Sequence, residues 1–191
     1  MALRTVKVCT IGIYGSTRAA FFDALETAGV DVFLDIRRRR AVRGSQYSYA
    51  NAERLTGELA AREIEYRHIL DLAPDEDTLA TQHAADSKEK RLKSERTELA
   101  TEYIEKYVTR TLNRFDFSTL ASELEEFSTP VLFCIERIPQ ACHRSLVAPK
   151  LASALGTAEI IHLIPEGAAF ETQRLLRQIK RNRSARRKRF G

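Results

Sequence analysis

Short apolar runs rich in β-branched and aromatic residues alternate along this chain with stretches of helical spacing. Residues 30–36 are apolar almost throughout, which is typical of a strand buried on both faces of a parallel sheet. Similar strand-like runs occupy residues 6–11, 64–69, 130–135 and 158–164. Because strands that alternate with helices pair mostly in parallel, this order predicts a single Rossmann-like α/β domain. We expect about five mostly parallel strands with helices on both faces.

The stretches between these runs carry helix start and stop signals. Apolar residues at helical spacing over 17–28 end at Gly29, and Asn51 is placed to cap a helix that runs to about residue 62. A charged amphipathic stretch over about 83–127, broken near residues 116–118, predicts a helical insertion. We also expect a helix over 142–155, directly after the fourth strand.

Composition limits the class of protein further. A chain of 191 residues with 43% hydrophobic and 30% charged residues can bury one sizeable core and is not wholly disordered. No apolar run approaches the roughly 18 to 20 residues of a membrane helix, so we expect no membrane partner. The chain enters strand-like sequence without the features of a secretory signal, and its three cysteines are sparse. We therefore expect a cytoplasmic protein.

The positive charge is concentrated in the last part of the chain. Residues 171–191 carry nine Lys or Arg against one Glu, or +8, whereas residues 1–170 carry −3. This divides the chain into an α/β domain over 1–170 and a basic tail over 171–191, either helical or disordered. Such a tail can neutralise phosphates and so bind nucleic acid. The tail residues expected to do so are Arg181, Arg183, Arg186, Arg187, Lys188 and Arg189.

Polar residues gather directly after the predicted strands, where ligands bind in open α/β sheets. The candidate substrate- or anion-binding residues after the first three strands are Gly12, Tyr14, Ser16, Arg37, Arg38 and His68. Asp35 ends the second strand beside Arg37, whose guanidinium matches either a carboxylate or a phosphate. Asp35 is therefore a candidate catalytic residue, with a structural ion pair as the alternative.

The segment 134–144, after the fourth strand, is the richest in reactive side chains. At the first turn of a helix beside His143 and Arg144, Cys142 would have a stabilised thiolate and could act as a nucleophile. His143 is a candidate general acid or base near neutral pH, and a buried Glu136 could do the same. Arg144 is a further candidate for binding an anion.

The sequence predicts neither a metal site nor a cofactor. Cys134, Cys142 and His143 lack the C-x-x-C or H-x-x-x-H spacing of common zinc sites. Cys134 lies inside a predicted strand, where a small buried side chain is expected. The loop over 12–16 matches no phosphate-loop or dinucleotide motif.

Five pieces of the chain together resemble the family of domain of unknown function 488 (DUF488). They are Thr10-Ile11-Gly12, Val32-Phe33-Leu34-Asp35-Ile36-Arg37, Ile64-Glu65-Tyr66-Arg67-His68, Phe133-Cys134-Ile135-Glu136 and Cys142-His143-Arg144. The resemblance covers most of residues 6–164. It implies an α/β fold with a polar site made of Asp35, Arg37, Glu136, Cys142, His143 and Arg144, and it implies no particular reaction.

Three classes of function remain open. The first is a hydrolase acting on a nucleotide, nucleic acid or other phosphate-bearing molecule, either by N-glycosidic cleavage through carboxylates or by attack of Cys142. The second is a noncatalytic nucleic-acid-binding module, and the third is a structural or partner-binding protein with an internal ion-pair network. The helical insertion either caps the site or forms the contact of a homodimer. The sequence favours the enzyme.

Overall fold

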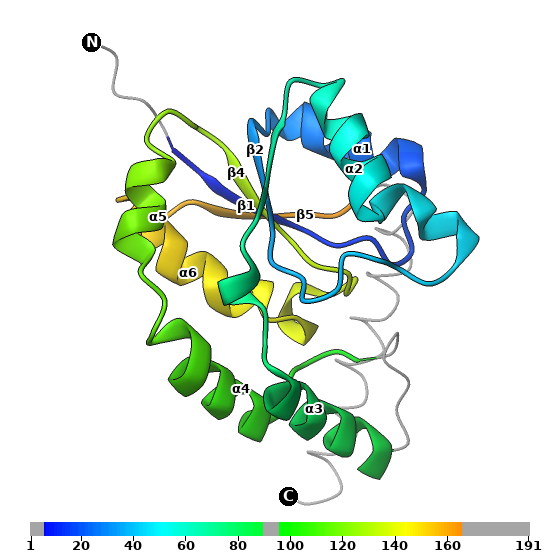
Figure 1. The fold of residues 1–191 in the computed structure, drawn as a ribbon, viewed down its shortest axis with the longest axis vertical. Helices are drawn as coiled ribbons and strands as arrows, with labels where there is room; N and C mark the ends of the chain where they lie inside the picture. The colour runs from blue at the N-terminus through cyan, green and yellow to red at the C-terminus, as the bar shows by residue number, and fades with distance from the viewer. Residues whose placement is uncertain (1–5, 90–95, 166–191) are drawn as a thin grey trace, which may run out of the picture.

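The computed structural model describes residues 6–89 and 96–165 and contains one five-stranded sheet in which all paired strands are parallel (Figure 1). The strands are β1 (Val8–Ile11), β2 (Val32–Asp35), β3 (Glu65–His68), β4 (Pro130–Phe133) and β5 (Ile160–Leu163). Their order across the sheet is β3-β2-β4-β1-β5. The predicted α/β class with five parallel strands is confirmed.

The three central strands form the buried middle of the sheet. Every residue of β1, β2 and β4 is buried, whereas β3 and β5 lie at the edges and are partly exposed. This explains why β2 is apolar up to its last residue, while β3 carries Glu65 and Arg67. In register, Val131 of β4 pairs with Cys9 of β1 and with Phe33 of β2.

Helices α1 (Arg18–Ala28) and α2 (Ala52–Ala60) cover one face of the sheet (Figure 1). Thr17 caps α1 by accepting a hydrogen bond from the backbone N–H of Ala20, and Gly29 ends the helix in the left-handed conformation, at φ 66°. The short 3₁₀ helix η1 (Ser45–Ala50) precedes α2. The large side chains of this core are Phe21, Phe22, Leu25, Phe33, Tyr49, Leu55 and Phe133.

A second helical layer lies on the opposite side of the sheet (Figure 1). It contains α3 (Glu76–Lys88), α4 (Thr101–Tyr107), α5 (Phe117–Glu123) and α6 (Arg144–Ala154). Its buried side chains come from both the sheet and the helices and include Val32, Leu34, Leu132, Tyr107, Leu120, Val147 and Leu151. The expectation of helices on both faces is confirmed.

The boundaries of this layer differ from the predicted insertion. Helix α3 begins at Glu76, because the side chain of Asp75 caps it by accepting a hydrogen bond of 2.6 Å from the N–H of Thr78. The stretch expected to stay helical until the break near residues 116–118 is divided, since α4 starts only at Thr101 and passes into a π-helical turn, η4 (Val108–Leu112).

The start of α6 also corrects the prediction for Cys142. The 3₁₀ turn η5 (Pro139–Ala141) precedes this cysteine, and the N–H of Cys142 bonds to the Pro139 carbonyl at 3.0 Å. Cys142 is therefore extended, at φ −139° and ψ 142°, and α6 begins two residues later at Arg144. The cysteine lies just before the helix and not within its first turn.

The described helices are short. Helix α3 has 13 residues, so it spans about 20 Å at 1.5 Å per residue, against roughly 30 Å for the hydrocarbon core of a bilayer. Among residues 6–89 and 96–165, no helix is both long enough and apolar enough to cross a membrane.

Candidate functional site

The loops after β1, β2 and β4 meet at one edge of the sheet because these strands are neighbours. The N–H of Cys134 bonds to the carbonyl of Ile11 at 3.3 Å, which joins the segment after β4 to the end of β1. On the other side, the N–H of Ile36 bonds to the carbonyl of Phe133 at 3.3 Å. This is the edge at which ligands bind in open α/β sheets, and most of the predicted site residues lie there.

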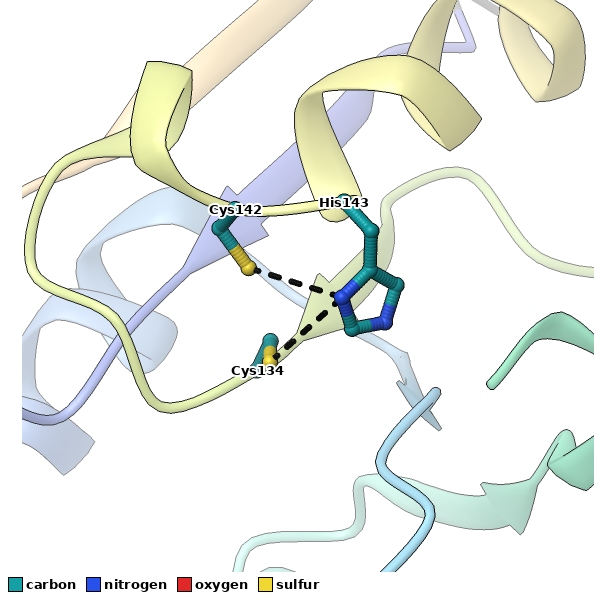
Figure 2. Close-up of side chains that lie close together, drawn as sticks. All are labelled: Cys134, Cys142 and His143. Atoms are coloured by element: carbon teal, nitrogen blue, oxygen red, sulfur yellow. Dashed lines mark hydrogen bonds between the residues drawn. The ribbon is translucent and has the colours of Figure 1, made fainter. Parts of the chain in front are cut away.

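Two thiols and one imidazole meet at this edge (Figure 2). Nδ1 of His143 lies 3.9 Å from Sγ of Cys134 and 3.9 Å from Sγ of Cys142, and all three ligand atoms lie within 4.8 Å of one another. Cys134, Cys142 and His143 are 6%, 2% and 6% exposed. Nε2 of His143 donates a hydrogen bond of 3.0 Å to the carbonyl of Ile36, so Nδ1 is the nitrogen that faces the sulfurs.

The two thiols differ in acidity. Burial opposes charge on Cys142, but the Cys134 thiol together with the positive charges of Arg144 and His143 holds the pKa of Cys142 well below its usual value. The hydrogen bond to Cys142, followed by burial, raises the pKa of Cys134 well above its usual value. Burial alone would lower the pKa of His143, yet the adjacent Cys142 raises it. Both shifts act in the same direction, toward a Cys142 thiolate beside a His143 imidazolium.

Glu136 connects this cluster to the helical layer. Sγ of Cys134 donates a hydrogen bond to Oε2 of Glu136 at 3.5 Å, and Oε1 of Glu136 lies 3.7 Å from Nη1 of Arg96. Arg96 also forms a two-pronged ion pair with Asp86, which accepts a further hydrogen bond of 2.9 Å from Gln82. All of these polar side chains are buried, so Glu136 belongs to a charged network and is not an isolated carboxylate.

Arg96, Asp86 and two tyrosines are site residues that the sequence analysis missed. The Tyr107 ring contacts the imidazole of His143 edge-on, with centroids 5.5 Å apart, and its hydroxyl donates a hydrogen bond of 2.6 Å to the Leu72 carbonyl. Burial raises the pKa of Tyr107 and of the stacked Tyr103 well above the usual value, so both stay neutral. Two tyrosines four positions apart on one helix face were the available signal.

Arg144 holds the loop after β4 in place. Its Nη1 donates to the carbonyl of Glu136 at 2.7 Å and its Nη2 to the carbonyl of Arg137 at 3.2 Å, while the side chain is 1% exposed. Gly12 lies against the same loop, and a Cβ there would stand 2.0 Å from the Glu136 carbonyl oxygen. The close approach of two backbones requires glycine at this position.

Asp35 and Arg37 form a buried bidentate ion pair. Nε and Nη2 of Arg37 donate to the two carboxylate oxygens of Asp35 at 2.8 and 2.7 Å, and Nη1 donates to the Ala50 carbonyl at 3.0 Å. The hydroxyl of Tyr66 donates a further hydrogen bond of 2.9 Å to Asp35, and the guanidinium lies 4.5 Å from the centroid of the Phe133 ring. Both groups are thus engaged in contacts within the protein.

The remaining predicted residues surround this ion pair and the loop after β1. Nε2 of His68 donates to the carbonyl of Arg37 at 2.9 Å, on the side toward β3. Ser16 donates its hydroxyl to the carbonyl of Ile13 at 2.6 Å, and Tyr14 donates its backbone N–H to the loop after β4 at 3.1 Å. These contacts fix the shape of the edge.

Arg38 begins a cluster of exposed positive charge at the same edge. The exposed basic side chains after β2 are those of Arg38, Arg39, Arg40 and Arg43, which we call the arginine run. The basic tail predicted over 171–191 lies outside the residues that the structure describes.

Fold and site together define a parallel α/β protein with a buried thiol–imidazole cluster at the carboxyl edge of its sheet. The family model described as "Domain of unknown function DUF488" matches residues 17–151, well over half of the chain. The chain belongs to the DUF488 family, as the resemblance indicated. No curated protein and no solved structure gives a match.

Proposed function

We propose that the chain is a hydrolase that cleaves phosphate esters at this edge of the sheet, with Cys142 as nucleophile and His143 as general acid and base. The observation that supports it is the approach of Cys142 Sγ to His143 Nδ1, at 3.9 Å. A nucleophile beside a base whose other nitrogen is held by a third group is the usual arrangement for covalent hydrolysis. Here the Ile36 carbonyl is that third group.

Attack by a thiol fits the contacts better than N-glycosidic cleavage by carboxylates. Glycosidic hydrolysis uses two carboxyl groups that flank the sugar, one as acid and one as base or nucleophile. Both oxygens of Asp35 are taken by Arg37 and Tyr66. Glu136 contacts Cys134 and Arg96. We therefore propose that Asp35 and Glu136 position the neighbouring side chains and do not react with the substrate.

The proposed reaction has two steps. Sγ of Cys142 attacks phosphorus, an S–P bond forms, and the P–O bond to the leaving group breaks while Nδ1 of His143 gives its proton to the leaving oxygen. Water then attacks the phosphorus of the phosphocysteine while Nδ1 of His143 takes a proton from that water. The S–P bond breaks, phosphate leaves, and the thiolate is restored.

The arginine run provides positive charge for an anionic substrate. Arg37 and Arg144 are buried and bonded to carboxylate or carbonyl oxygens, so neither guanidinium is directed at solvent. Arg38 to Arg40 and Arg43 are exposed beside the site and can raise the local concentration of phosphate-bearing molecules. Since Cys142 is only 2% exposed, the residues that cover its thiol must move before a substrate can react with it.

We expect Cys142→Ser to lower hydrolysis of a phosphate-ester panel, nucleotides included, by at least about 1,000-fold, because the hydroxyl is a far weaker nucleophile at neutral pH. Cys9→Ser is the matched control. Cys9 is a buried cysteine of β1 whose pKa burial raises to about 11, and its replacement should leave the rate unchanged in the folded protein. A Cys142→Ser protein of unchanged melting temperature that still hydrolyses its substrate would rule out the thiol as nucleophile.

A noncatalytic nucleic-acid-binding module is the second candidate, and the arginine run is the observation that favours it. We expect Arg38→Ala/Arg39→Ala/Arg40→Ala to weaken binding of labelled DNA and RNA. The slope of log K against log salt should become shallower by about 0.7 to 0.9 for each phosphate that is no longer neutralised. Arg54→Ala/Arg114→Ala/Lys150→Ala removes the same charge from exposed positions elsewhere. Equally weakened binding by the two triple variants would argue against a localised interface.

A further inference from the structure

We propose that Cys134, Cys142 and His143 form a site for a divalent transition metal ion of the zinc class. Hydrolysis by Cys142 does not require such a site, so this inference goes beyond the proposed function. The cluster offers two sulfur ligands and one imidazole nitrogen, all buried and all within 4.8 Å of one another. Thiolate and imidazole are the ligands that zinc prefers in proteins.

The two S···N distances are close to those of tetrahedral coordination. With sulfur at about 2.3 Å and nitrogen at about 2.0 to 2.1 Å from zinc, a tetrahedral site places sulfur and nitrogen ligand atoms about 3.5 to 3.6 Å apart. The two S···N separations here are 3.9 Å. Each S···N separation must therefore shorten by about 0.3 to 0.4 Å for an ion to bind both atoms.

The imidazole already has the orientation that a ligand needs. Nε2 of His143 donates to the Ile36 carbonyl, and this fixes Nδ1 toward the two sulfurs (Figure 2). A metal-binding histidine almost always donates its second ring N–H to a carbonyl or carboxylate in this way. The edge-on Tyr107 ring, 5.5 Å away, further restricts rotation of the imidazole.

Charge and burial also favour an ion at this place. Two thiolates and a neutral imidazole carry −2, so a divalent ion makes the buried cluster neutral and avoids the cost of isolated charge in the interior. Glu136 Oε2 accepts a hydrogen bond of 3.5 Å from Cys134 Sγ, so a carboxylate directly contacts one of the two sulfur ligands. A single ion also needs much less access to the interior than a phosphate ester does.

Metal binding and nucleophilic attack exclude each other at Cys142. A sulfur that donates its electron pair to a metal ion cannot also attack phosphorus, so the metal-loaded protein should be inactive in the proposed hydrolysis. Only this consequence rests on the proposed function. If Cys142 is the nucleophile, a bound metal ion would therefore inhibit hydrolysis at the same site.

Titration of the full chain with Co²⁺ under reducing conditions tests the site directly. We expect the ultraviolet charge-transfer band of thiolate–Co²⁺ bonds and the strong visible bands of a tetrahedral ion to saturate at one equivalent, and Zn²⁺ to displace them. Cys134→Ser and Cys142→Ser should each lose the bands, whereas Cys9→Ser should keep them. Absence of the bands in the wild-type protein, or their persistence in Cys142→Ser, would overturn the proposal.

Alkylation of the wild-type protein gives a second test that does not depend on the folding of a variant. One equivalent of Zn²⁺ should slow the modification of Cys134 and Cys142 at least 10-fold, as measured by peptide mass spectrometry, and leave Cys9 unchanged. Equal rates with and without Zn²⁺ would contradict the site. Co²⁺ bands in a protein whose metal-free form also lacks hydrolytic activity would support the metal site and count against the proposed function alone.

Discussion

Asp35→Asn is expected to lower the free energy of unfolding by about 3 to 5 kcal/mol, as measured by denaturant titration. Asp35 is fully buried, and its carboxylate is the acceptor for two guanidinium hydrogen bonds from Arg37, which is 3% exposed. The amide leaves the guanidinium buried without an opposite charge, and it turns a donating –NH₂ group toward Arg37 or Tyr66. Removing one partner from a buried ion pair is therefore costly.

The controls for this change lie in the same segment. Arg38→Ala removes a neighbouring but exposed charge and should change stability by no more than about 0.5 kcal/mol. Asp35→Leu/Arg37→Met replaces the pair by apolar groups and should recover much of the stability, because no charge then remains buried. A decrease below about 1 kcal/mol in Asp35→Asn would mean that water reaches the pair, contrary to its burial.

Gly12→Ala is expected to destabilise the protein by at least about 3 kcal/mol, the upper part of the range for forced overpacking. The added Cβ would stand 2.0 Å from the carbonyl oxygen of Glu136 and 3.2 Å from Nη1 of Arg144. Backbone cannot rotate away as a side chain can, so the loop after β4 must move. The same movement should expose the thiols and speed alkylation of Cys142.

Gly57→Ala is the matched control, because it adds the same methyl group as Gly12→Ala at a position with free space. Nothing lies within 4 Å of the new Cβ inside helix α2, so the substitution should raise stability by about 0.5 to 1 kcal/mol through better helix propensity. Opposite signs for the two glycines are the expected result. If both changes raised the melting temperature, the close approach at Gly12 would be refuted.

The sheet could be predicted because the apolar composition of its central strands already indicates that they are buried. The apolar runs that became β2 and β4 are covered on both faces. The edge strand β3 was predicted from the strand-like run over 64–69, although it carries Glu65 and Arg67. The boundaries of the second helical layer could not be predicted. The buried residues of α3 are Thr78, Gln82 and Asp86, so its inner face has no apolar periodicity to detect.

The site could be predicted as a set of residues but not as a set of contacts. Asp35, Arg37, Glu136, Cys142 and His143 do lie at one edge, because polar residues after neighbouring parallel strands converge there. Their partners depend on side-chain directions set by the whole fold. Common metal-site motifs place two ligands only a few residues apart. Cys134 and Cys142 are eight positions apart, and the loop between them brings their sulfurs together, so such a motif could not identify them.

The position of β4 has a consequence for the order in which this protein can fold. During synthesis β1 and β2 emerge first, yet they are not neighbours, and the place between them is filled only by β4. The β1–β4 pairing joins Cys9 to Val131, far apart along the chain, and contacts of such long range slow folding. Until residue 133 has left the ribosome, β1 and β2 each present an unpaired edge that can associate with other chains. Cys134, Cys142 and His143 come after this strand in the chain, so the reactive cluster can form only once β4 has been made.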